Sequence, residues 1–185
     1  PDGRPLHLVH RDVSLSNIMV GHDGSVKLID FGIASSTASI HTTNPGIVRG
    51  KASYMSPEQC RGDPVDLRTD VFALGVVLHE LVCRRRLFRR ATEEETIVAL
   101  LWGTIPPLAV PDEARALLQP IVDRALARDP ALRYPSAGPF GDALFAVLER
   151  LAPGADGAAS VAALVASASA GDGPAIEPGA EGTDD

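Results

Sequence analysis

The stretch "HRDVSLSNIMV", residues 10–20, is the part of the sequence from which the fold can be worked out. It sets an acid at Asp12 and an amide at Asn17, and an apolar run begins directly afterwards. An isolated acid in a turn is usually a surface group, so the meaning of this stretch depends on the motifs that come later in the chain.

Length and composition bound the kind of protein. The chain has 185 residues, enough for one sizeable domain. Its formal net charge of −7 is unfavourable for binding nucleic acid by bulk charge. Cys60 and Cys83 have no metal-like spacing, which favours a reducing compartment. The longest apolar run, residues 71–78, is far shorter than the ~20 residues that span a membrane. We expect a cytoplasmic protein with no nucleic-acid partner and no membrane segment in this chain.

The hydrophobic pattern predicts short strands followed by helices. Apolar runs predict strands at 6–9, 17–20 and 26–29, with a turn at 21–24. Apolar faces and capping residues predict helices at 69–83, 92–101, 112–128 and 136–151. Pro120 is expected to kink or split the third of these helices.

The last part of the chain has a different composition. Residues 152–185 are rich in Ala, Gly, Ser, Asp and Glu and contain no aromatic residue. We expect this tail to be largely disordered and acidic. Within it, residues 157–170 have enough alanine to form a loose helix.

Three short signals occur in a fixed order: "HRDVSLSN" (10–17), "DFG" (30–32) and "YMSPEQ" (54–59). On these motifs the chain resembles the eukaryotic-type serine/threonine protein kinases, in particular their bacterial members, from about Leu6 to Leu151. The resemblance implies an α+β fold: the mainly α-helical C-terminal lobe of a kinase, with a few short β-strands around the catalytic loop. We expect residues 1–151 to form this lobe and the N-terminal lobe to be absent.

The resemblance also implies cofactors, ATP and Mg²⁺, and roles for the residues of the site. Asp12 would be the catalytic aspartate that orients the substrate hydroxyl and accepts its proton. Asn17 and Asp30 would supply the oxygen ligands of magnesium. Met19 would be the apolar floor beneath the adenine ring, although a plain core position explains it equally well.

Four neighbouring residues would have structural roles on the same resemblance. His10 would pack beneath Phe31 rather than act as a base, and Gly32 would let the backbone swing. Asp70 would both cap its helix and hold the backbone of the catalytic loop.

An ion pair and a regulatory contact complete the implied set. Glu58 would form a buried ion pair with Arg133. Arg11 would clamp a phosphate on the following loop, with Thr42 and Thr43 as the candidate phosphosites. An ordinary polar loop rich in hydroxyls explains these two threonines as well.

One position departs from the family pattern. The lysine that usually comes two residues after the catalytic aspartate is replaced by Ser14, and Lys51 stands where a loop threonine is usual. Our hypothesis is that the two groups have exchanged places, so that Lys51 reaches Ser14, Asp12 and the γ-phosphate from the opposite side. The alternative is that Lys51 is a solvated loop charge in a weakened site.

The basic run "CRRRLFRR", residues 83–90, has two interpretations. It is either a docking patch for acidic substrates or regulators, or a solvated loop with Leu87 and Phe88 against the core. The latter is favoured, since the acidic residues 93–95 come soon after it and could pair with it.

The expected function is ATP-dependent phosphoryl transfer to serine or threonine hydroxyls of a protein substrate. No glycine-rich loop or strand lysine precedes residue 10, so catalysis would require an N-terminal lobe, and this stretch alone would have little activity. The alternative is a non-catalytic, kinase-like binding module. A small-molecule kinase is disfavoured because "DFG" is followed by "PE" and an Asp-headed buried helix.

Overall fold

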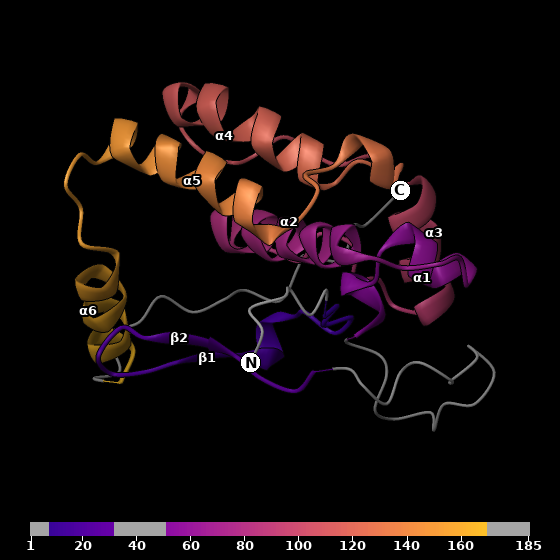
Figure 1. Ribbon diagram of the computed structural model, residues 1–185, viewed down its shortest axis with the longest axis horizontal. Helices are drawn as coiled ribbons and strands as arrows, with labels where there is room; N and C mark the ends of the chain where they lie inside the picture. The colour runs from indigo at the N-terminus through magenta and orange to yellow at the C-terminus, as the bar shows by residue number, and fades with distance from the viewer. Residues whose placement is uncertain (1–7, 32–50, 170–185) are drawn as a thin grey trace, which may run out of the picture.

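The computed structural model describes residues 8–31 and 51–169, and these form a mainly helical body with one two-stranded sheet (Figure 1). The elements of the N-terminal half are η1 (Leu15–Asn17), β1 (Ile18–Val20), β2 (Val26–Leu28), η3 (Ala52–Tyr54), α1 (Pro57–Arg61) and α2 (Leu67–Cys83). Those of the C-terminal half are α3 (Glu93–Trp102), α4 (Asp112–Ala125), η4 (Pro130–Leu132), α5 (Ala137–Leu151) and α6 (Gly157–Ser169). The expected α+β class is confirmed.

The strands β1 and β2 form an antiparallel hairpin in which Ile18 pairs with Leu28. Gly24 closes its turn at φ 78°, a conformation that favours glycine. The predicted turn is therefore present. The strand predicted at 6–9 is not, as far as it is described, because Leu8 and Val9 lie in no strand. An apolar run becomes a strand only where a partner strand completes its ladder.

Helix α2 is the centre of the body, and it begins two residues earlier than predicted. Its N-cap is Asp66, whose side chain accepts a hydrogen bond from the Arg68 amide at 2.9 Å. Asp70 lies in the first turn, so its predicted capping role is wrong, because its carboxylate is used elsewhere. Gly75 lets α4 approach closely, since a β-carbon there would lie 3.0 Å from the Cβ of Ala125.

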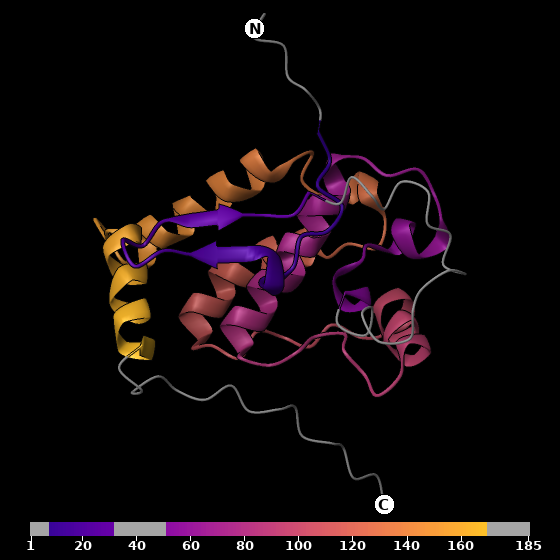
Figure 2. The ribbon, with the colours of Figure 1, turned by 90° about the horizontal axis from the view of Figure 1, so that it is seen from below.

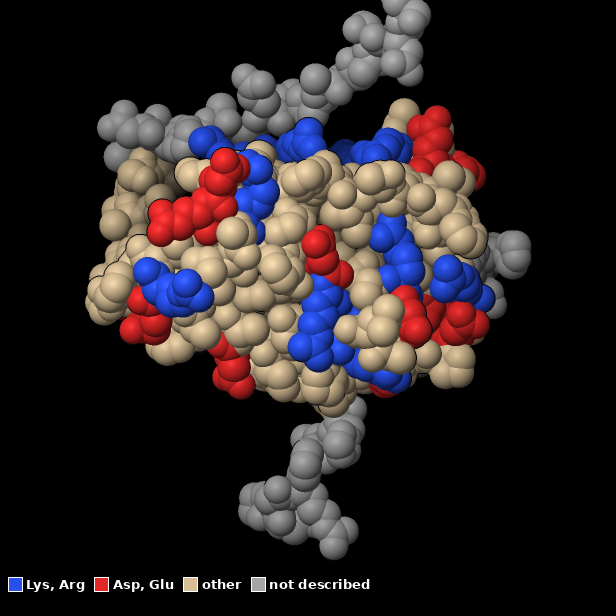
Figure 3. Space-filling view, turned by 90° about the horizontal axis from the view of Figure 1, so that it is seen from above, with Lys and Arg blue, Asp and Glu red and all other residues tan. Residues whose placement is uncertain are grey.

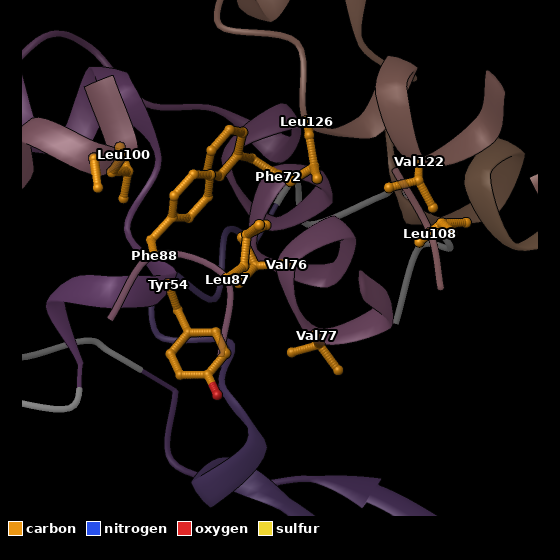
Figure 4. Packing of buried hydrophobic residues seen from close by; sticks show 11 residues of the cluster. Tyr54, Phe72, Val76, Val77, Leu87, Phe88, Leu100, Leu108, Val122 and Leu126 are labelled. Carbon is orange, nitrogen blue, oxygen red and sulfur yellow. The ribbon is translucent and has the colours of Figure 1, made fainter. Parts of the chain in front are cut away.

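Two apolar clusters pack against α2. In the larger one, the rings of Phe72 and Phe88 stack with centroids 6.1 Å apart (Figure 4). The smaller one joins α2 to α4 and α5. Helix α4 is a single helix with Pro120 inside it, so the predicted split does not occur. The following residues Ile121 and Val122 are buried, and their packing stabilises the turn from which proline removes a hydrogen bond.

The tail continues into a helix at the far end of the molecule. Helix α6 lies beside the turn between β1 and β2 in both ribbon views (Figures 1 and 2). A β-carbon on Gly24 would come within 1.9 Å of the Ala158 carbonyl oxygen, so the two backbones touch. The helix expected from alanine content is thus present at 157–169.

The charge distribution on the surface and the apolar character of the helices can both be described. On the face seen from above, acidic and basic residues are interspersed among larger areas of other residues (Figure 3). Within the described ranges, no helix combines the length and apolar character needed to cross a membrane.

Candidate active site

The loop that carries Asp12, the predicted catalytic loop, is held by the first turn of α2. The Asp70 carboxylate accepts hydrogen bonds from the backbone amides of His10 at 2.8 Å and Arg11 at 2.9 Å. Arg11 has φ 67°, a left-handed conformation that non-glycine residues adopt rarely. These bonds stabilise that backbone, so Asp70 occupies the anchoring position that the sequence analysis expects for it.

His10 packs where the resemblance places it. Its buried ring lies 4.6 Å from the Phe31 ring, centroid to centroid, and its Nε2 is 3.1 Å from the Ile29 carbonyl oxygen. Its Nδ1 accepts from the Asp12 amide at 3.3 Å. Both ring nitrogens are thus engaged with backbone, which fits a structural role for the side chain rather than a catalytic one.

Asp12 is oriented by a buried amide. The Asn17 Nδ2 donates to the Asp12 backbone oxygen at 2.7 Å and to its Oδ2 at 3.0 Å. Because the nitrogen is committed to Asp12, the amide oxygen of Asn17 is the acceptor that remains. Among the residues described, no hydrogen bond is made to that oxygen, so it fits a ligand for a hard cation.

The hairpin brings the second candidate metal ligand to the same end of the sheet. Asn17 precedes β1 and Asp30 comes after β2, and the Ile29 amide donates to the Asn17 carbonyl oxygen at 2.9 Å. Asp30 is exposed and has φ 57°, in the left-handed region that non-glycine residues adopt rarely. The pair of donors fits Mg²⁺, although residues 8–31 and 51–169 contain no cluster of three His, Cys, Asp or Glu.

Lys51 reaches Asp12, the predicted catalytic aspartate. Its Nζ lies 2.5 Å from Asp12 Oδ2, and the two side chains are 45% and 19% exposed. Ser14 differs from the hypothesis, because its buried hydroxyl pairs with the Ser16 hydroxyl at 2.9 Å and, among the described residues, forms no hydrogen bond with Lys51. The geometry therefore brings Lys51 to Asp12 and leaves Ser14 within its own loop.

A buried ion pair ties the segment after the site to the helical body. Arg133 donates from Nη1 to Glu58 Oε1 at 2.7 Å and from Nη2 to Oε2 at 2.8 Å, and Thr69 adds a bond at 2.8 Å. Burial is the largest influence and by itself raises the pKa of Glu58, but Arg133, a backbone hydrogen bond and Thr69 together outweigh it and hold that pKa below its ordinary value. The expected contact between these two residues is present.

A second buried network was not foreseen from the sequence. The Tyr54 hydroxyl donates to Glu80 Oε2 at 2.7 Å, and Arg86 Nη1 donates to the same oxygen at 2.8 Å. Burial, and then the bond to Glu80, raises the pKa of Tyr54 well above its ordinary value, so the phenol stays a neutral donor. The only available signal was Glu80 itself, an acid interrupting an otherwise apolar helix.

The remaining predicted residues lie in several parts of the chain. Met19 lies on β1 with 55% of its surface exposed, so it is not a core residue of the part of the chain that the structure covers. Gly32, Thr42 and Thr43 lie outside the described residues. Leu87 and Phe88 are buried, as the loop interpretation of 83–90 expects. The acidic residues 93–95 form no described ion pair with that loop, and Glu95 instead completes a capping box with Thr92.

The chain belongs to the protein kinase domain family, whose model matches residues 5–137. It is 44% identical over 143 residues to the tyrosine-protein kinase MasK of Myxococcus xanthus, covering 77% of this chain and 22% of that protein. It is 39% identical over 140 residues to the serine/threonine-protein kinase PknA of Mycobacterium tuberculosis, covering 76% of this chain and 32% of PknA.

A third relative, the serine/threonine-protein kinase PknL of Mycobacterium tuberculosis, is 38% identical over 146 residues, 78% of this chain and 37% of PknL. The chain therefore spans about a fifth to somewhat over a third of the length of these relatives. The family is that of the bacterial-type protein kinases.

Proposed function

We propose that this chain is the C-terminal lobe of an ATP- and Mg²⁺-dependent protein kinase that phosphorylates serine or threonine hydroxyls. The observation that carries the proposal is the setting of Asp12. Its Oδ2 accepts a hydrogen bond from Asn17 and pairs with Lys51, at the hairpin end that also presents Asp30. Two relatives named serine/threonine kinases support the choice of acceptor.

In this mechanism, Asp12 accepts a hydrogen bond from the substrate hydroxyl and orients its oxygen. Asp12 takes the hydroxyl proton as that oxygen bonds to the γ-phosphorus of ATP, while the bond from the γ-phosphorus to the leaving ADP breaks. Mg²⁺ bound to ATP neutralises phosphate charge, and Asn17 and Asp30 are the residues that would hold it. Met19 would face the adenine ring from below.

Lys51 carries the role that departs from the family pattern. An ammonium group beside Asp12 can move from the proton acceptor to the phosphate oxygens, because a flexible four-carbon stem allows a short swing. Its charge then opposes the negative charge that develops on the transferred group. Ser14, held by Ser16, would support the loop rather than touch the phosphate.

The N-terminal lobe and the regulatory contacts are part of the same proposal. ATP needs a cover over its adenine and phosphates, so catalysis would require such a lobe together with this chain. Arg11 would bind a phosphate placed on Thr42 or Thr43, and phosphosite mapping of the active enzyme would identify which one is used. We also propose a cytoplasmic location and no nucleic-acid partner.

The test uses the whole natural polypeptide that contains this chain, with radiolabelled ATP and a generic protein substrate. We expect incorporation of label that Asp12→Asn lowers by about 10²–10⁴-fold, since the general base is lost while the fold is kept. Phosphoamino acid analysis then separates serine and threonine from tyrosine, the acceptor in the name of MasK. Label on tyrosine alone would overturn the stated acceptor.

The alternative is a kinase-like binding module without catalysis. Retention of Asp12, Asn17 and Asp30 speaks against it, because a binding surface has no chemical need for all three. A natural polypeptide that binds ATP and magnesium but transfers no phosphate under any activating condition would favour the module and contradict the proposed enzyme.

A further inference from the structure

A pocket of about 240 Å³ has Lys51, the partner of Asp12, in its lining, and the mechanism above assigns no ligand to it. Its walls come from three separate parts of the chain: Leu15 and Ser16 from the catalytic loop, Lys51, Ser53 and Tyr54 from the segment around η3, and Arg86 and Arg89 from the basic loop. Lys51, one of its walls, contacts Asp12. A peptide presenting a hydroxyl to Asp12 would therefore pass this pocket.

The charges around the pocket are unequal. Its lining contains three cationic side chains, Lys51, Arg86 and Arg89, and no carboxylate. Behind the lining, the Glu80 carboxylate is fully used: one oxygen accepts from Tyr54 and Arg86, and the other accepts from the Leu87 amide at 3.0 Å. Glu80 thus fixes Arg86 without presenting an anion to a ligand.

Arg86 keeps part of its donor capacity for a ligand. Both of its side-chain bonds within the described residues leave from Nη1, while 41% of the side chain is exposed. The planar guanidinium carries five N–H donors, so its Nη2 and Nε remain able to bind an anion. Although burial disfavours the charged form, the bond to Glu80 keeps the pKa of Arg86 above its ordinary value.

Arg89 is the cation that decides the sign of the pocket. It is exposed, and in the part of the chain described here its guanidinium has no acidic partner. The loop that carries it is not loose, because Leu87 and Phe88 between the two arginines are buried (Figure 4). Arg90 also donates to the Leu87 and Arg89 carbonyl oxygens at 3.2 and 2.9 Å. Packing therefore holds Arg86 and Arg89 at the pocket.

We infer that this pocket binds an anionic side chain of the substrate peptide, a carboxylate or a phosphoryl group close to the acceptor hydroxyl. The inference rests on the proposed function for the identity of the ligand as a substrate. Ser16 and Tyr54, which both carry hydroxyl groups, also line the pocket. Bidentate hydrogen bonds from arginine suit both a carboxylate and a phosphoryl group. The basic run thus acts as a specificity element, with its apolar residues as the anchor.

The test is a peptide set in which one flanking position at a time, on either side of a threonine, carries Glu, Gln, Arg or phosphoserine, and peptides are ranked by kcat/KM or, where no phosphate is transferred, by binding. With the whole natural polypeptide, we expect one or two positions where Glu raises kcat/KM about fivefold to tenfold over Gln, and where Arg lowers it. Arg89→Glu should abolish or reverse this preference at those positions. Arg85→Glu, on the same loop but outside the pocket lining, is the matched control and should leave it unchanged.

A binding measurement separates the failure of this inference from failure of the proposed function. The best Glu peptide, with its threonine changed to alanine and a fluorophore attached, is titrated by anisotropy against the same proteins. Binding that Arg89→Glu weakens and Arg85→Glu does not supports the pocket even if no phosphate is transferred to any peptide. Equal kcat/KM or equal binding for Glu, Gln and Arg at every position would overturn the inference, with phosphotransfer itself intact.

Discussion

Lys51 and Glu58 lie seven residues apart, and each forms an ion pair with a distant residue. The two pairs differ in their exposure and in the number of bonds that join them. Glu58 and Arg133 are joined by two bonds, with side chains only 7% and 0% exposed. Asp12 and Lys51 are joined by one bond, with side chains 19% and 45% exposed. The first pair cannot separate without leaving a buried charge, while the second can exchange partners with solvent or ligand. The comparison separates an ion pair that stabilises the fold from one whose partners can exchange with a ligand.

The buried pair should give the largest effect on stability. Arg133→Met leaves the Glu58 carboxylate buried without its cation, and we expect a loss of about 3–5 kcal/mol in the free energy of unfolding. Urea denaturation followed by circular dichroism measures it. The double variant Glu58→Leu with Arg133→Met is the control, and it should recover part of the loss. A single variant within about 1 kcal/mol of the parent would contradict this account.

The exposed pair should show the opposite behaviour. Lys51→Ala should change the free energy of unfolding by under about 1 kcal/mol, as for other exposed pairs. In the whole natural polypeptide it should lower kcat by about 10²-fold or more, as does loss of other groups that stabilise a developing negative charge. Lys51→Arg, which keeps the charge, is the control. Full kcat in Lys51→Ala would refute the exchange of roles with Ser14.

Acid should weaken the buried pair in a defined direction. The pKa of Glu58 is below its ordinary value of 4.5 in the folded state, so the unfolded state binds the proton more readily. Its contribution to stability is complete above pH 4.5 and is lost as the pH falls through the lower folded-state pKa. Unfolding free energies measured from pH 6 to pH 3 should therefore fall less steeply in the Glu58→Leu, Arg133→Met double variant than in the parent. Parallel curves would show that other carboxylates dominate.

The smallest effect separates two aspartates at the start of α2. Asp66→Ala removes the N-cap and should cost about 1 kcal/mol in unfolding free energy, with kcat unchanged. Asp70→Ala leaves the amides of His10 and Arg11 without their acceptor. It should raise the activation free energy of phosphoryl transfer by more than it lowers the free energy of unfolding. Thermal melts and phosphotransfer rates of the two variants give the comparison. Equal losses of kcat would show that the cap and the anchor are not distinct.

The sequence was a good guide where the relevant interactions are local or strongly patterned. The four helices, the hairpin turn and the Glu58–Arg133 pair could all be predicted, since they arise from apolar periodicity or from the family motifs. The approach of Lys51 to Asp12 could be predicted from the family pattern. The usual lysine is replaced by Ser14, and Lys51 stands where a loop threonine is usual.

Three features of the structure could not be predicted from the sequence, because they depend on tertiary packing. Several residues near the start of α2 can cap a helix, and only the tertiary use of Asp70 leaves Asp66 as the cap. The network of Tyr54, Glu80 and Arg86 joins positions that no local pattern relates. The continuity of α4 through Pro120 depends on buried neighbours, which a single-residue rule does not include.

The two amide bonds to Asp70 also have a consequence for motion. The amide protons of His10 and Arg11 belong to a loop without regular secondary structure, yet their acceptor is fixed to the first turn of a buried helix. They can exchange with solvent only when those bonds break, so native-state hydrogen exchange should report how often the loop separates from the Asp70 carboxylate. The protection of these two amides therefore measures how firmly the start of α2 holds the loop that carries Asp12.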